Sequence, residues 1–253
     1  KRRRWDHMKA IYQPTGKARE YGDLACNLYR GCAHGCDYCY APGVFRPRMT
    51  KEEFANSIPR PGILKALEKD AKKYSGSRVP IFLSFTSDPY QPIENNSITR
   101  KAMQILHENR CGINILTKGG MRAAADFDIL AANSDSWFGT TLTYSDELKS
   151  KEHEPGAAIP KDRITAIKEA KKMGINTWVS MEPIVGYKPA ISLIYNTIDF
   201  VDLYKIGKMN HRKGISSQEL KDFLTDAIML LDSNGKDYYI KMDTRPFVDK
   251  VAS

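Results

Sequence analysis

The chain has few cysteines and no long hydrophobic run, and each feature argues against one class of protein. Five cysteines among 253 residues are too few, and odd in number, for the disulfide framework of a small secreted protein. No stretch approaches the roughly 18 consecutive apolar residues of a membrane-spanning helix, and no secretory signal peptide is visible. We therefore expect a protein without a membrane partner that works in the reducing cytoplasm.

Internal repeats, low-complexity segments and linker-like stretches are also missing. Hydrophobic residues make up 42% of the chain and charged residues 27%, as in an ordinary globular protein. A chain of this length can bury one sizeable core. The sequence therefore predicts a single domain over residues 1–253.

Acidic residues are outnumbered by basic ones, 30 against 39, and the formal net charge is +9. An excess of positive charge favours a polyanionic partner such as a nucleic acid or nucleotide. Lysine pairs such as Lys72-Lys73 and Lys171-Lys172 are also typical of solvated helix faces, so the charge favours this partner without deciding it.

Short apolar runs alternate with amphipathic stretches along the chain. The strand-like runs are residues 23–28, 79–85, 112–117, 137–143, 175–181 and 200–206, with a shorter run at 238–242. The helix-like stretches are residues 61–74, 98–109, 121–132, 162–173, 189–196 and 217–231. Such alternation predicts parallel strands with right-handed crossovers, and six units favour a partial (β/α)6 TIM-type barrel over a closed barrel of eight.

Three of the five cysteines, Cys32, Cys36 and Cys39, lie in one loop after the first predicted strand. A C-x3-C-x2-C loop can hold three corners of a [4Fe–4S] cube and leave the fourth iron open to a small molecule. A structural zinc site is the alternative, and it would need a fourth ligand such as Cys26 or His34. No second C-x2-C or H-x3-H pair follows in the chain, so the open cluster is the favoured interpretation.

Polar residues also follow the next five predicted strands where each strand ends. These stretches are residues 84–92, 117–120, 140–146, 181–186 and 205–211. Barrels of this type carry their chemistry on the loops after the carboxyl ends of the strands. We therefore expect these residues to surround one cavity beside the cysteine loop.

Taken together with the cysteine loop, several motifs resemble the spore photoproduct lyase-like branch of the radical SAM superfamily, also called DNA repair photolyases. They are T-S-D-P-Y-Q-P-I-E at 86–94, Thr99-Arg100, Thr117-Lys118, H-E-P-G at 153–156 with Arg163, and Glu182-Pro183-Ile184. The similarity runs from about residue 26 to 186. It implies a core at about 20–186 that binds the cluster and S-adenosylmethionine (SAM), and a C-terminal part at about 187–253 that selects the substrate.

The resemblance also implies an activity. A [4Fe–4S] cluster on Cys32, Cys36 and Cys39 would cleave SAM reductively to methionine and a 5′-deoxyadenosyl radical, which takes a hydrogen atom from the substrate. Such an enzyme needs a one-electron donor of the flavodoxin or ferredoxin type. Whether the overall reaction is that of a lyase or an isomerase is left open.

Five residues are expected near SAM. Tyr38 and Tyr40 are positioned to cover the adenine and the cluster, or else are core aromatics. Ser87 and Asp88 stand where other branches have a glycine-rich turn; they offer acceptors for the methionine ammonium, or simply build a Ser-Asp-Pro turn. Lys118 is expected to meet the carboxylate or ribose of SAM, the alternative being a surface lysine.

Two further residues complete the predicted SAM site. Thr141 aligns with a family serine that contacts SAM, although Thr140 and Thr143 compete for this role. Arg163 stands at the start of a predicted helix, where a cation opposes the helix dipole. A carboxylate partner, from SAM or from Glu154, would explain this position.

Two residues are predicted to act on the substrate. Glu182 precedes a proline at a strand end, where it faces the substrate or braces a loop. His211 follows the sixth strand and is the histidine that we expect to contact the substrate. Cys26 and Cys111 are expected to pack in the core.

One departure from the branch limits the choice of substrate. Spore photoproduct lyases carry, two residues before the Ser-Asp pair, a cysteine that donates a hydrogen atom to the product radical, and this chain has Phe85 there. A phenyl ring cannot donate in this way, so we expect another substrate, such as a base in phage-type DNA modification. RNA, a peptide or a small metabolite are alternatives, as is a non-catalytic nucleic-acid-binding protein with a zinc or sensing iron–sulfur site.

Overall fold

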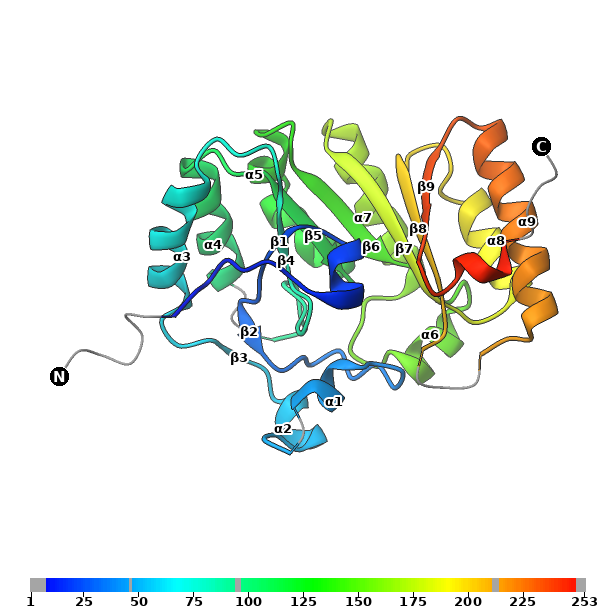
Figure 1. Cartoon of the computed structure of the whole chain (residues 1–253), viewed down its shortest axis with the longest axis horizontal. Helices are drawn as coiled ribbons and strands as arrows, with labels where there is room; N and C mark the ends of the chain where they lie inside the picture. The colour runs from blue at the N-terminus through cyan, green and yellow to red at the C-terminus, as the bar shows by residue number, and fades with distance from the viewer. Residues whose placement is uncertain (1–7, 46, 94–96, 211–213, 249–253) are drawn as a thin grey trace.

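Seven parallel strands form one continuous sheet in the order β1-β4-β5-β6-β7-β8-β9 (Figure 1). The computed structural model describes residues 8–45, 47–93, 97–210 and 214–248. The strands are β1 (Leu24–Cys26), β4 (Ile81–Leu83), β5 (Ile113–Thr117), β6 (Trp137–Thr141), β7 (Asn176–Ile184), β8 (Leu203–Lys208) and β9 (Asp237–Ile240). All seven predicted strands are confirmed, and so is the partial TIM-type barrel.

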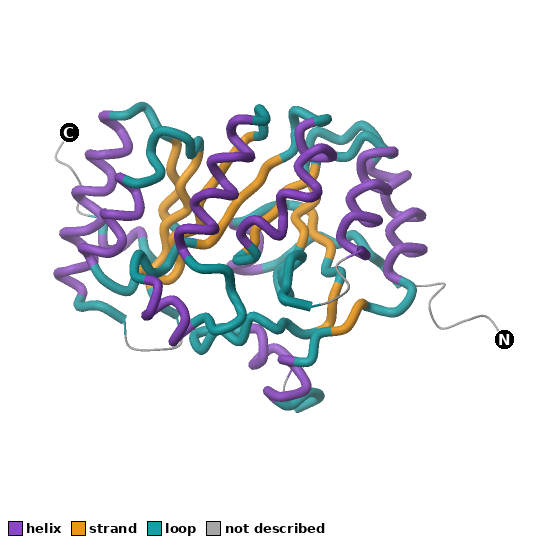
Figure 2. Tube along the Cα trace, turned by 180° about the vertical axis from the view of Figure 1, so that it is seen from behind, coloured by secondary structure: helices purple, strands orange, loops and turns teal. Residues whose placement is uncertain are grey.

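Helices cover one face of this sheet, as Figure 2 shows from behind. They are α3 (Ile63–Ala71), α4 (Ser97–Glu108), α5 (Phe127–Ala131), α7 (Pro160–Lys172), α8 (Tyr187–Tyr195) and α9 (Ser217–Ser233). Each of these helices corresponds to a helix predicted from the sequence. The stretch predicted at 121–132, however, begins as a 3-10 helix, η3 (Gly120–Asp126). No helix in the described part of the chain is long and apolar enough to cross a membrane.

The sequence did not predict several short elements around the cysteine loop and after β6. They are β2 (Tyr29–Arg30), α1 (Ala41–Phe45), α2 (Lys51–Ala55), β3 (Ile58–Pro59) and α6 (Glu147–His153). With so few residues, none shows a periodic pattern, and local contacts form them instead. In α2, for example, Thr50 and Glu53 each accept a hydrogen bond from the other's backbone as a capping box.

Successive side chains along each strand point to opposite faces of the sheet, and an apolar layer lies on each face. In β4, Ile81 and Leu83 face the large core beneath the helices, whereas Phe82 faces the concave side together with Ala25 and Trp178. Gly139 leaves the space that the Trp178 ring occupies, since a Cβ atom there would lie 2.3 Å from the ring. Aromatic side chains thus form the floor of the barrel.

The N-terminal segment crosses the concave side, opposite the helices (Figure 1). It runs through the 3-10 helix η1 (Gly16–Glu20) to β1. Lys17 donates to Asp243 over 2.6 Å, and the Glu20 carboxylate accepts from Met242 N at 2.7 Å. These contacts join the chain before the first strand to the chain after the last strand, and so span the open side of the partial barrel.

Candidate active site

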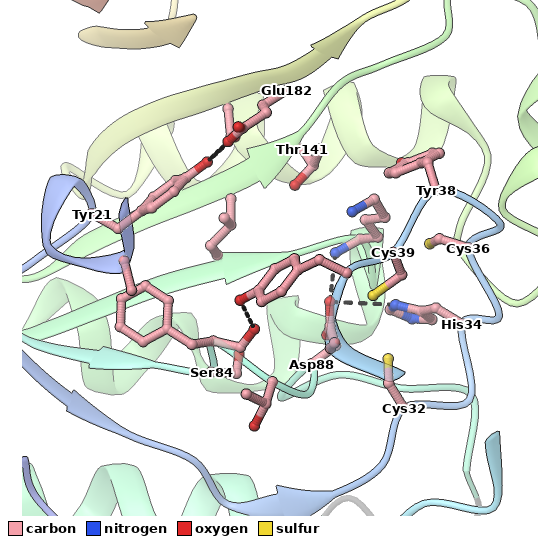
Figure 3. Close-up of a pocket in the computed structure, with 18 of the residues that line it drawn as sticks. Tyr21, Cys32, His34, Cys36, Tyr38, Cys39, Ser84, Asp88, Thr141 and Glu182 are labelled. Atoms are coloured by element: carbon pink, nitrogen blue, oxygen red, sulfur yellow. Dashed lines mark hydrogen bonds and ion pairs between the residues drawn. The ribbon is translucent and has the colours of Figure 1, made fainter. Parts of the chain in front are cut away.

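A cavity of about 310 Å³ lies at the carboxyl ends of the strands. The cysteine loop lines one end of it, and Tyr21 and Glu182 line the opposite end (Figure 3). The carboxyl-terminal residues of β5, β6 and β7 and the residues that follow β4 contribute side chains between these ends. The polar stretches that the sequence predicts at strand ends therefore do meet at one cavity.

All three cysteines of the loop are free and line this cavity, and their side chains lie on the same side of it (Figure 3). The loop begins at Gly31, which has a φ of +88° and where a Cβ atom would lie 2.3 Å from Phe54 O, so the position requires glycine. Cys32 N then donates to Phe54 O over 2.8 Å. Backbone contacts with the α2 segment thus fix the entry to the loop.

Burial keeps the unligated thiols of Cys32 and Cys36 protonated. It raises the pKa of Cys36 to about 11 and that of Cys32 further above its ordinary value. A metal must displace these protons when it binds. Cys26 and Cys111 are buried in the core, as predicted, and do not line the cavity.

Two polar groups in the cavity wall have no hydrogen-bond partner among the described residues. The Ser87 hydroxyl is buried without a hydrogen bond. The Lys118 ammonium lies 5.6 Å from the centre of the Tyr38 ring and has no hydrogen-bond acceptor within the described residues. Although burial acts to lower the pKa of Lys118, Cys36 and Glu154 raise it above its ordinary value, so the group stays cationic.

The carboxylate of Asp88, next to Ser87, already accepts hydrogen bonds from other residues of the chain. Its carboxylate accepts from Thr117 Oγ1 at 2.6 Å, from Tyr90 N at 2.8 Å and from Lys118 N at 2.9 Å. His34 Nδ1 lies 3.4 Å from the same carboxylate. Burial alone would raise the pKa of Asp88, but His34 and these donors hold it well below its usual range.

The two predicted tyrosines both line the cavity. Tyr38 donates its hydroxyl hydrogen to Glu154, and Tyr40 donates to Phe85 O over 2.7 Å. Burial raises the pKa of both phenols well above the ordinary value, so both remain neutral donors. Tyr40 is 48% exposed and lies at the rim of the cavity.

Of the three candidate threonines, Thr141 lines the cavity. Thr140 instead donates to Thr117 O over 2.8 Å, and Thr143 lies 3.4 Å from the Tyr38 hydroxyl. Arg163 is buried behind the wall and is absent from the lining. Its partner is Glu154, one of the two carboxylates that the sequence offered.

At the far end of the cavity, three donors converge on Glu182. They are the Tyr21 hydroxyl, Lys241 Nζ at 2.6 Å and Asn210 Nδ2 at 3.0 Å. Gly207 makes room for this contact, because a Cβ atom there would lie 2.8 Å from Lys241 Cδ and 3.0 Å from Glu182 Cδ. His211 lies outside the described residues.

The sequence missed Tyr21 and Lys241. Tyr21 precedes the first strand and belongs to no motif, so nothing local marks it. Lys241 directly follows β9, and the rule that chemistry gathers at strand ends could have found it had it been applied to the seventh strand.

Phe85 and Lys205 pack on the aromatic floor. Phe85 stacks on Phe82 with ring centres 4.4 Å apart. Lys205 Nζ donates to Glu20 O over 2.9 Å and lies 5.1 Å from the centre of the Trp178 ring. Burial and the nearby Lys241 lower the pKa of Lys205 to about 8.

Residues 26–201, more than half of the chain, match the radical SAM superfamily. The chain belongs to this superfamily. It is 27% identical over 200 residues to an uncharacterized protein of Methanocaldococcus jannaschii, covering 78% of this chain and 73% of that protein. It is 23% identical over 239 residues to one from Acidianus two-tailed virus, covering 85% and 76%.

Solved structures of radical SAM enzymes share the fold. Spore photoproduct lyase complexed with dinucleoside spore photoproduct aligns with a TM-score of 0.69 at 13% identity, over 90% of this chain and 78% of that one. Streptococcus suis SuiB bound to S-adenosylmethionine aligns with a TM-score of 0.68 at 12% identity, over 90% of this chain. This chain spans about half of SuiB, 52% of its length.

A radical SAM enzyme uses a [4Fe–4S] cluster and SAM, so the cofactors predicted from the sequence are confirmed. The cavity residues fit them. Each thiolate of a cube binds a different iron, so the three sulfurs need not converge on one point. In the described residues, no group of three or more His, Cys, Asp or Glu side chains could hold a single metal ion.

Proposed function

We propose that Cys32, Cys36 and Cys39 hold the cluster of this radical SAM enzyme and that the cavity beside them binds SAM. The observation that carries the proposal is the composition of one cavity wall: three free thiols, and a serine hydroxyl and a lysine ammonium that lack a hydrogen-bond partner among the described residues. With both cofactors bound, the cluster would supply the electron that cleaves SAM to methionine and a 5′-deoxyadenosyl radical.

The chain's own residues bind and orient SAM. The Lys118 ammonium, which stays charged, pairs with the SAM carboxylate, and the Ser87 hydroxyl accepts from the methionine ammonium. Tyr38, Tyr40 and Thr141 line the space between the cysteine loop and the far end of the cavity and contact the adenosyl part. Asp88 and Arg163, both predicted to contact SAM, hold other residues of the site through the internal bonds described above.

The substrate that we propose is a nucleic-acid base or a nucleotide. Three features support it: the net charge of +9, a cavity with aromatic rings in its wall and floor, and the dinucleoside bound by spore photoproduct lyase. Unstacked bases pack against such rings in many nucleic-acid-binding proteins. Glu182 faces this substrate and residues of about 187–253 select it, while the contact expected of His211 stays a prediction from the sequence.

A peptide is the second candidate, since SuiB, which has the same fold, is described as bound to the precursor peptide SuiA. Either reaction depends on an electron donor of the flavodoxin or ferredoxin type and on a reducing compartment such as the cytoplasm. The two candidates differ in which compound speeds the cleavage of SAM.

Anaerobic reconstitution tests the proposal. The wild-type chain should bind iron and sulfide, turn brown and, once reduced, release 5′-deoxyadenosine slowly from SAM. Alanine at Cys32, Cys36 or Cys39 should each abolish the cluster, while alanine at the core residue Cys111 should leave it in place. A cluster that survives loss of any of the three loop cysteines would refute the ligand assignment.

A further inference from the structure

One side chain in each gap between the three cysteines is anchored by a buried carboxylate. His34 lies between the first and second cysteines and Tyr38 between the second and third. His34 Nδ1 lies 3.4 Å from Asp88, and the Tyr38 hydroxyl donates to Glu154. Asp88 is 7% exposed and Glu154 1% exposed, so both contacts are shielded from water.

Asp88 joins the first gap to the sheet. Beyond His34, its carboxylate binds Thr117 Oγ1 and Lys118 N at the end of β5, over 2.6 and 2.9 Å. The turn that carries Asp88 adds a second link, because Gln91 Oε1 accepts from Ala33 N over 2.7 Å. The cysteine loop is thereby fixed to the carboxyl ends of β4 and β5.

Glu154 joins the second gap to α7. Its other partners are Arg163 Nη2, with which it forms a buried ion pair, and Ser150 Oγ at 3.2 Å. Arg163 is itself held by Ala158 O at 2.6 Å. Arginine, a hydroxyl and a phenol together compensate the charge of this carboxylate, as a buried charge requires.

Backbone contacts place the segment 153–156 directly along the loop. Asp37 N donates to His153 O over 3.0 Å, and Gly156 N donates to His34 O over 2.9 Å. Gly156 is needed for this approach, since a Cβ atom there would lie 2.3 Å from Ala33 O. The H-E-P-G motif therefore has a physical role: it is packed against the stretch that carries the cysteines.

We propose that Asp88 and Glu154 are positioning residues for the iron–sulfur cluster, each fixing one gap of the cysteine loop through His34 or Tyr38. A loop held in place before the metal arrives loses less conformational freedom on binding. Some groups contact the metal ligands rather than the metal and so orient the ligands. Removal of such a group commonly lowers metal affinity tenfold or more. The inference rests on the proposed function, because it requires that the three cysteines ligate iron.

The test measures how fast reconstituted protein, without SAM, loses iron to a chelator under anaerobic conditions. We expect Asp88→Asn, Glu154→Gln, His34→Leu and Tyr38→Phe each to release iron about tenfold faster than the wild type. The electron paramagnetic resonance spectrum of the reduced cluster should shift in each. Glu169→Gln, which removes a partly exposed carboxylate from an ion pair on α7, should release iron at the wild-type rate.

The loop-side variants keep the test decisive if the loss of a buried carboxylate prevents folding. Tyr38→Phe removes one of three donors to Glu154 and leaves the pair of Glu154 and Arg163 intact, so the variant should fold and should release iron faster than the wild type. Rates within twofold of the wild type in both His34→Leu and Tyr38→Phe would overturn the inference. A wild-type chain that binds no iron would instead overturn the proposed function.

Discussion

At the scale of single residues, the cavity is incomplete without a ligand. Buried polar groups almost always have a hydrogen-bond partner, yet the Ser87 hydroxyl has none among the described residues, and the Lys118 ammonium meets only the face of an aromatic ring. Both lie in the wall that the cysteines share. The amino and carboxyl groups of SAM supply the kinds of partner that these two groups lack.

Lys118→Ala should therefore weaken the binding of SAM to the cluster-loaded protein. A charge-assisted hydrogen bond contributes about 1.5–3 kcal/mol, which corresponds to about a 10- to 150-fold higher dissociation constant. Ser87→Ala removes a neutral partner and should cost about 0.5–1.5 kcal/mol. Equilibrium titration with SAM measures both effects, with the exposed Lys161→Ala as the matched control. An unchanged dissociation constant for Lys118→Ala would contradict this placement of the SAM carboxylate.

Neighbouring residues with similar chemistry can have different roles, and the sequence could not separate them. Ser87 and Asp88 are adjacent, but only the hydroxyl is left without a partner. Arg163 was correctly predicted to need a carboxylate, while the choice between SAM and Glu154 depended on a contact between residues in different elements. Tyr21 reaches Glu182 across 161 residues of sequence, and no local pattern records such a contact.

At the scale of elements, the strands were the most predictable part. Their apolar runs are bounded by turn residues, and all seven appear in the sheet. The elements that were missed, such as α1 (Ala41–Phe45) and α6 (Glu147–His153), are too short to show a helical period. α6 leads directly into the segment that packs on the cysteine loop, so the missed helix helps to position the site.

Substitution of Gly139 in β6 tests the packing of the aromatic floor. The Cβ atom of Gly139→Ala would lie 2.3 Å from the Trp178 ring, which is fully buried and cannot retreat without moving its neighbours. Overpacking of this kind typically lowers the free energy of unfolding by about 1–3 kcal/mol. Denaturant unfolding would show this loss, whereas Gly43→Ala, which meets no atom within 4 Å, should cause none. Equal stability of the two variants would contradict the described packing.

The lowered pKa of Lys205 in β8 predicts how the free energy of unfolding depends on pH. Its pKa is lowered from 10.5 to about 8 in the folded chain by burial and by Lys241. Between these values the unfolded chain binds the proton that the folded chain has lost, so this group makes the free energy of unfolding rise with pH. The rise is at most about 1.4 kcal/mol per pH unit.

Comparison with Lys205→Met isolates this effect. The difference in unfolding free energy between wild type and variant should shift in favour of the wild type from pH 8 to pH 10, measured by denaturant titration at each pH. Other groups that titrate in this range are present in both proteins and largely cancel. A difference that stays constant over the range would show that Lys205 keeps its proton in the folded chain.

At the scale of the whole molecule, the partial barrel is braced across its open side by the chain's own N-terminal segment. Lys17 and Glu20 in η1 bind residues that follow β9, and Lys205 of β8 binds the backbone of the same segment. Tyr21, which ends this bridge, packs on Phe82 and Trp178 and lines the cavity. The far end of the site is thus assembled from the first and last parts of the fold, which explains why motif analysis found Glu182 there but missed Tyr21 and Lys241.

The excess of positive charge can be tested at the same scale through the salt dependence of nucleic-acid binding. Each phosphate contact adds about −0.9 to the slope of the logarithm of the association constant against the logarithm of salt concentration. Neutralising Lys208, Arg212 and Lys213, three basic residues within six positions of the sequence, should reduce the steepness of this slope by about 2 to 3 for single- or double-stranded DNA while leaving the cluster intact. Neutralising the exposed Lys65, Lys69 and Lys101 should leave the slope nearly unchanged, because these lysines lie on α3 and α4, which cover the face of the sheet opposite the N-terminal segment. DNA and nucleotides that neither bind nor speed the release of 5′-deoxyadenosine, beside a peptide that does, would instead identify a peptide as the substrate.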